Sequence, residues 1–114
     1  MKIVDVKLKK YNGEEFPAEV FLNLKSIKAI DRELKELNPD YGYFKSLPLI
    51  DQQDVTVTSI YLTNITHKKG ETRPLGADFF DNYQIDYFAC YDILVQALLE
   101  CMTDNKPTTE EEKK

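Results

Sequence analysis

The stretch from Asp81 to Met102 constrains the fold more than any other part of this 114-residue chain. It contains neither proline nor glycine and predicts one long helix. Its polar residues form only a narrow stripe on that helix: Asp92, Gln96 and Glu100, with Asp86 at the edge. Most of the remaining circumference is apolar, which is wider than a surface helix needs. The sequence therefore predicts burial on two sides, by a sheet and by a second copy in a homodimer.

The N-terminal part alternates as a β-hairpin does. Its apolar positions are Val4, Val6 and Leu8, then Ala18, Val20 and Leu22. A two-residue turn at Asn12–Gly13 would pair even with odd positions and mix the two faces. A three-residue turn, Tyr11–Gly13 with Gly13 left-handed, pairs even with even and keeps the apolar side chains together. Pro17 predicts a sheet edge at that point of the second strand.

The middle of the chain predicts a helix, a loop and a strand. A helix capped by Ser26 carries Ile27, Ile30, Leu34 and Leu37 on one face and ends at Asn38-Pro39-Asp40. Residues 41–51 predict a loop packed down by its own aromatic and aliphatic side chains. Residues 54–66 are rich in valine, isoleucine and threonine and predict a third strand, with a bulge at Thr58-Ser59. His67 to Ala77 predicts a polar loop.

These elements predict an α+β fold in the order ββαβα, with a small antiparallel sheet packed on two helices. One domain is expected over residues 1–102, followed by a flexible charged tail over 103–114. Cys90 and Cys101 would lie about 16 Å apart along the last helix, too far for a disulfide. They are expected to be reduced residues of the core.

Charge and composition exclude some classes of function. The net charge of −5 disfavours non-specific binding to nucleic acid or to an anionic membrane. No apolar run approaches the roughly 18 residues of a membrane span. The first residues, Met1 to Asp5, lack the apolar core of a signal peptide. We therefore expect a cytoplasmic protein that contacts neither membrane nor nucleic acid directly.

The sequence shows no catalytic or metal-binding pattern. His67 is the only histidine, and neither cysteine is near it in sequence. A structural metal site needs close-spaced pairs of ligands, and no such pair occurs. The loop after His67 has no phosphate-binding glycine spacing. We expect no enzyme activity, no catalytic residue, no metal and no cofactor.

The C-terminal half combines acidic and aromatic residues. No lysine or arginine occurs between Arg73 and Lys106, whereas six acidic residues do. Such a surface suits a basic partner, because aromatic rings give contact area and acids give orientation. The leading hypothesis is a non-enzymatic accessory or inhibitory protein that binds a macromolecule, such as a basic nucleic-acid-binding protein. The expected contact residues are Tyr83, Tyr87, Asp86, Asp92, Gln96 and Glu100.

Other hypotheses stay open from the sequence. The aromatic residues from Phe79 to Tyr91 form either the core, with the acids as its solvent-facing stripe, or the binding surface itself. In a small-ligand binder, aromatic rings would stack a nucleotide base and basic residues would hold its phosphate. The residues expected for that function are Tyr41, Tyr43, Lys68, Lys69 and Arg73. A structural subunit of an assembly is a further alternative, and the composition is typical of small bacteriophage and mobile-element proteins.

Overall fold

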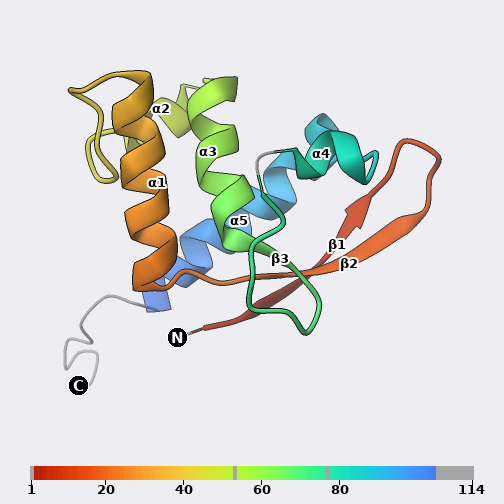
Figure 1. Ribbon diagram of the computed structural model, residues 1–114. Coiled ribbons are helices and arrows are strands. Elements are labelled where there is room, and N and C mark those ends of the chain that lie inside the picture. Colours follow the sequence, from red (N-terminus) through yellow and green to blue (C-terminus); the bar gives the residue numbers. More distant parts are fainter. Residues whose placement is uncertain (1, 53, 77, 105–114) are drawn as a thin grey trace.

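The computed structural model describes residues 2–52, 54–76 and 78–104 and shows an α+β fold (Figure 1). One three-stranded antiparallel sheet, in the order β1-β2-β3, is combined with helices, which confirms the predicted fold class. The predicted tail lies outside the described residues except for 103–104, which belong to the last helix. In chain order the elements are β1 (Val4–Lys9), β2 (Glu15–Val20), α1 (Leu24–Leu37), α2 (Leu47–Asp51), α3 (Val55–Ile65), β3 (Thr66–Lys68), α4 (Phe79–Asn82) and α5 (Tyr87–Asp104).

The hairpin has the predicted register. Val6 pairs with Ala18, and the turn closes between Lys10 and Glu14. Gly13 has φ +91°, a conformation that costs other residues strain. The even-numbered side chains of both strands form the buried face, as the parity argument predicts. β3 pairs only with the end of β2 from Ala18 onward, so Pro17 stands at an edge.

The strand predicted over residues 54–66 is wrong, because α3 occupies nearly all of it and β3 is only Thr66–Lys68. The Asp54 side chain caps the helix by accepting the Val57 N–H at 3.0 Å. The change of parity at Thr58-Ser59 reflects a helix and not a bulge, because the buried positions recur at helical spacing and include 57, 58, 61, 62 and 65. Tertiary burial on several sides overrides the β-branched composition.

Two further boundaries differ from the sequence prediction. α1 begins at Leu24, and its N-cap is Asn23 in place of the predicted Ser26, because Asn23 Oδ1 accepts the Ser26 N–H at 2.8 Å. The predicted loop over 41–51 contains a short helix, α2, with Pro48 in its first turn. The C-terminal end of α1 at Asn38 is as predicted.

The predicted helix over 81–102 is also wrong at its start, where the chain breaks between α4 and α5. Gln84 has φ +57°, and Ile85 forms a β-bridge with Lys10 of the hairpin. Asp86 then caps α5, because its Oδ1 accepts the Ala89 N–H at 3.1 Å. Backbone hydrogen bonds to the hairpin stabilise this break. The sequence gives no sign of it, because the segment contains neither proline nor glycine.

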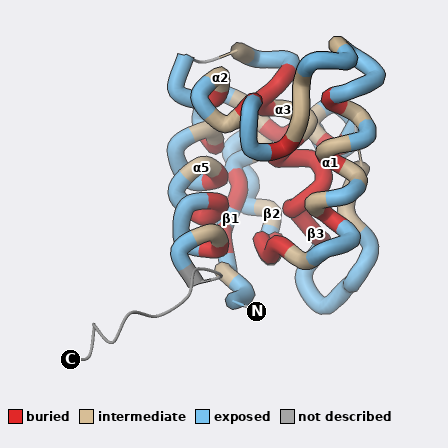
Figure 2. Tube along the Cα trace, turned by 90° about the vertical axis from the view of Figure 1, so that its left-hand side faces the viewer, coloured by how far each residue is buried: buried red, intermediate tan, exposed pale blue. Residues whose placement is uncertain are grey.

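The sheet and α5 pack face to face, and α3 contacts both α1 and α5 (Figure 1). Figure 2 shows α5 turning its buried residues toward β1 and its exposed residues outward. Cys90 and Cys101 are both buried, as expected of core residues, and no disulfide joins them. Burial and the nearby Asp86 raise the pKa of Cys90, which lies against Lys9.

None of the described helices is long and apolar enough to cross a membrane.

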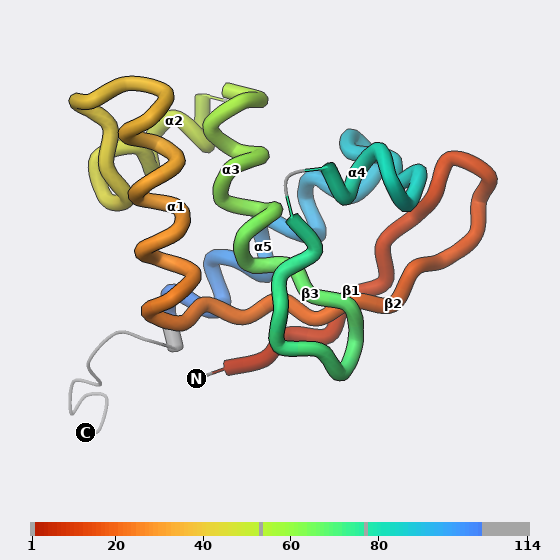
Figure 3. Tube along the Cα trace, in the orientation of Figure 1, coloured from red at the N-terminus to blue at the C-terminus, as the bar shows by residue number. Residues whose placement is uncertain are grey.

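The sequence predicts that His67 lies in a polar loop, and this prediction is wrong. His67 is the middle residue of β3, 1 % exposed, and its ring stacks on Phe21 with centroids 3.6 Å apart. The loop follows β3 and turns back toward α4, as Figure 3 shows by the course of the chain.

Candidate functional site

The outer face of α5 carries an exposed apolar stripe. Phe88 and Leu99 are 80 % and 49 % exposed, and they lie eleven residues apart, about 16 Å along the helix. Spacings of four, three, four and three residues place the following side chains in one row: Phe88, Asp92, Val95, Leu99 and Met102. A row of this kind is the geometry by which one helix face receives a partner.

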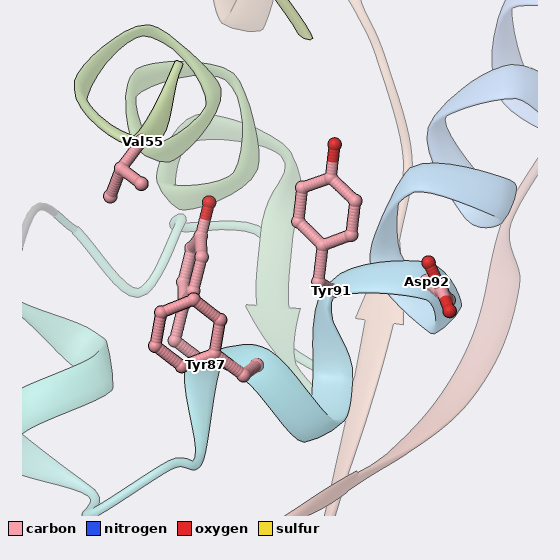
Figure 4. Close-up of a pocket in the computed structure, with 5 residues that line it drawn as sticks. Val55, Tyr87, Tyr91 and Asp92 are labelled. Atoms are coloured by element: carbon pink, nitrogen blue, oxygen red, sulfur yellow. The ribbon is translucent and has the colours of Figure 1, made fainter. Parts of the chain in front are cut away.

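The first of two pockets beside this stripe is aromatic. It has a volume of about 300 Å³ and is lined by Val55 of α3 with Tyr87, Phe88, Tyr91 and Asp92 of α5. Figure 4 shows the Tyr87 and Tyr91 side chains rising from α5 toward the helix that carries Val55. Three aromatic rings with one carboxylate provide what a cationic side chain needs, since ring faces and a carboxylate both attract positive charge.

The second pocket is aliphatic. It has a volume of about 250 Å³ and lies between α2 and the C-terminal half of α5. Its single charged residue is Asp51. The apolar lining residues are Leu47, Pro48, Ile50, Val95, Leu98, Leu99 and Met102. Aliphatic side chains of a partner are the groups that fit such a pocket.

Tyr91 and Tyr87 hold the aromatic pocket in place. The Tyr91 hydroxyl donates to the Ile50 carbonyl at 2.9 Å and so joins the wall of one pocket to a residue of the other. Burial, the larger effect, raises the pKa of Tyr87, although hydroxyls of α3 partly offset it. The Tyr87 ring also meets Phe80 edge-on, with centroids 5.0 Å apart. Rings fixed by such contacts lose little freedom when a partner binds.

The aromatic series from Phe79 to Tyr91 is divided between core and surface. Phe79 is fully buried, Phe88 is largely exposed, and Phe80, Tyr87 and Tyr91 lie between these limits. The series is therefore neither wholly core nor wholly exposed, and its role as a binding surface stays a prediction. The division follows from the break before α5, which gives α4 and α5 separate directions.

The structure brings together two of the six expected contact residues, Tyr87 and Asp92. Asp86 caps α5, and Glu100 forms an ion pair with Lys2 at 3.4 Å. Tyr83 packs against Phe16 of the hairpin, with centroids 4.9 Å apart. Gln96 is exposed on the solvent side of α5.

The residues expected for a nucleotide-like ligand are not brought together. Tyr41 and Tyr43 follow the end of α1, and Tyr43 is buried. The three basic residues follow α3 at the opposite end of the helices, about 20 Å away by helix length (Figure 3). Among them, Lys69 pairs with Asp5 at 2.9 Å.

Three residues of the aromatic pocket are absent from the expected contacts: Val55, Phe88 and Tyr91. The whole lining of the aliphatic pocket is absent from them too. Phe88 lies one turn before Asp92, so the helical period alone places it beside the polar stripe. Val55 lies in the stretch for which the sequence predicts a strand. In the described ranges, no group of three or more histidine, cysteine or acidic residues is placed to hold a metal ion. No protein-family model, curated protein or solved structure matches this chain.

Proposed function

We propose that the chain is a non-enzymatic accessory or inhibitory protein that binds a basic, partly apolar segment of a partner protein along α5. The observation that carries the proposal is Phe88, 80 % exposed beside Asp92 on an aromatic pocket. An exposed aromatic residue next to a preformed pocket is typical of an interface anchor. A lysine or arginine of the partner would enter the aromatic pocket, and an aliphatic residue would enter the second pocket.

Charge favours a basic partner over a second copy of this chain. Asp51 and Asp92 line the two pockets, and the sequence has no lysine or arginine from residue 74 to 105. A two-fold homodimer along α5 would place the same acidic face against itself, and like charges repel. Part of the wide apolar arc of α5 that suggested a homodimer is covered within the chain by β1, β2 and α3, and the exposed stripe is the remainder. A dimer is therefore the competing outcome.

A nucleic-acid-binding protein is the class of partner we propose, because such proteins concentrate lysine and arginine on one face. By covering that face, the chain would block its nucleic acid. The cytoplasm is the proposed location. An origin in a phage or mobile element stays a prediction from composition.

Selection of peptides from a random displayed library tests the proposal directly. We expect the selected peptides to contain lysine or arginine together with an aliphatic residue, and to bind more weakly as salt rises. Asp92→Lys should weaken a selected peptide about tenfold or more. Glu36→Lys makes the same charge change on an exposed site of α1 and should leave binding unchanged.

Three results would overturn the proposal. The first is enrichment of peptides without basic residues. The second is an equal loss of binding in Asp92→Lys and Glu36→Lys. The third is a dimer in analytical ultracentrifugation that Phe88→Ala dissociates, which would assign the stripe to a second copy.

A further inference from the structure

The rings of the aromatic pocket stand at steep angles to one another. The Tyr87 and Phe88 planes are 89° apart, with centroids at 5.3 Å, and the Tyr87 and Tyr91 planes are 55° apart, with centroids at 6.0 Å. Val55 adds an apolar wall from α3, on the side to which the two tyrosines point (Figure 4). Rings at such angles do not form one flat stack, so a group in the pocket meets aromatic surface from more than one direction.

The charge around the pocket is negative. Among the described residues that line it, Asp92 is the one that carries a charge. The Asp54 carboxylate at the start of α3 lies within electrostatic reach of Tyr87. Neither α3 nor α5 contains a lysine or arginine, so no cation of the two helices that form the pocket offsets these acids. Aromatic surface and uncompensated negative charge together favour a cation.

The pocket suits a bare lysine ammonium poorly. That group is compact and strongly hydrated, and it carries three N–H donors. Asp92 supplies the one carboxylate of the described lining, and ring surfaces replace water only weakly as acceptors. The volume of about 300 Å³ also far exceeds the roughly 30 Å³ that one water molecule occupies in the liquid. A bare ammonium would therefore leave most of the ring surface in contact with water.

We propose that the aromatic pocket binds an N-methylated ammonium, carried by a methylated lysine of the partner segment and held most tightly when it is trimethylated. The inference rests on the proposed function and names the residue that enters this pocket. Methyl groups remove the N–H donors, fill the space and spread the positive charge over the surface that touches the rings. Asp92 attracts the same charge, as in other sites where aromatic rings receive quaternary ammonium groups.

Small probes test the pocket without a partner protein. The chain is titrated with Nα-acetyl-lysine methylamide, with its Nε-trimethyl form, and with a neutral analogue in which carbon replaces the charged nitrogen. NMR signals of the Phe88 and Tyr91 rings and of the Asp92 amide report binding. We expect the trimethyl probe to bind about tenfold more tightly than either of the other two. Equal binding of the unmethylated probe would overturn the preference for methyl groups, and equal binding of the neutral analogue would overturn the role of charge.

Choline separates a methylated side chain from a free small molecule, because it carries the same trimethylammonium group. Weaker binding of choline than of the trimethyl probe supports a lysine side chain, whose chain also contacts the pocket wall. Tighter binding of choline would overturn the side chain as the source.

Matched variants assign the preference to the rings. Phe88→Leu keeps an apolar side chain at the pocket but removes one ring, so it should weaken the trimethyl probe and bring its affinity close to that of the unmethylated one. Phe44→Leu makes the same change at another exposed phenylalanine, outside the pocket lining, and should leave both affinities unchanged. Asp92→Asn should weaken the two charged probes alike and so preserve their ratio. Equal effects of Phe88→Leu and Phe44→Leu, or a preference that Phe88→Leu leaves intact, would refute the site.

Failure of this inference differs from failure of the proposed function. If selected basic peptides bind along α5 and trimethylation of their lysine brings no gain, the preference for methyl groups is wrong and the proposed function stands. If no basic peptide is selected although the trimethyl probe binds as expected, the proposed function is wrong and the pocket is a site for small quaternary ammonium compounds, which overturns the methylated lysine as its ligand.

Discussion

The Tyr91 hydroxyl donates a hydrogen bond to the Ile50 carbonyl at 2.9 Å, across 41 residues of sequence. This bond ties α5 to the C-terminal part of α2, the two elements between which the aliphatic pocket lies. The position of both pockets thus depends on a contact that neither segment specifies alone.

Tyr91→Phe tests this tie. The variant keeps the ring in the aromatic pocket but removes the hydroxyl that donates to the Ile50 carbonyl, so we expect a loss of about 1 kcal/mol in the free energy of unfolding. Urea unfolding followed by circular dichroism measures it. Tyr11→Phe, at an exposed tyrosine of the hairpin turn, is the matched control and should change stability by less than about 0.5 kcal/mol. Equal effects would show that the bond contributes nothing.

Phe79 and Phe88 provide a second test, because the same substitution should act oppositely on stability and binding. Phe79→Ala removes a fully buried ring and should cost about 3–5 kcal/mol. Phe88→Ala removes an exposed ring and should cost less than about 0.5 kcal/mol while abolishing peptide binding. Thermal unfolding and peptide titration of both variants decide the matter. A large stability loss in Phe88→Ala would mean that this ring belongs to the core.

The hairpin could be predicted because its register is local: turn length and strand parity leave one arrangement that keeps Val6 and Ala18 on one face. α3 could not, because its β-branched residues favour a strand and only burial between neighbours favours the helix. Within it, Thr63 and Asn64 satisfy their side chains by donating to backbone carbonyls three or four residues earlier. That pairing is visible only once the helix exists.

The sequence predicts only part of the candidate site, because composition is visible in the sequence and tertiary contacts are not. The acidic and aromatic character of the C-terminal half is a property of composition, and it led to Tyr87 and Asp92. The other roles depend on tertiary contacts: Glu100 meets Lys2 across the chain, and Asp86 becomes a helix cap only because the hairpin breaks the helix before it. Val55 entered the pocket through the unexpected α3.

The N-cap of α3 is a third test, aimed at the element that sequence composition disfavours. Asp54→Ala removes the acceptor of the Val57 N–H and should cost about 1 kcal/mol in the free energy of unfolding. Asp51→Ala, three residues earlier, removes an exposed carboxylate at the end of α2 and should have little effect. Urea unfolding of the two variants compares them. If both are neutral, burial alone holds this helix.

The last test concerns the pH dependence that His67 imposes. Burial holds the folded-state pKa below the unfolded value of about 6.5. Above that value both states carry a neutral ring and pH has no effect. As the pH falls through the unfolded pKa, the unfolded chain binds a proton first, so the free energy of unfolding decreases until the folded pKa is reached.

In chloride buffers we therefore expect the free energy of unfolding to fall between about pH 7 and 5.5. His67→Phe, which keeps a ring against Phe21, should remove the slope in this range. Asp31 cannot mimic the effect there, because the Tyr43 N–H holds the pKa of Asp31 below its usual value and its protonation occurs at lower pH. A slope that persists in His67→Phe would assign the pH dependence to other groups.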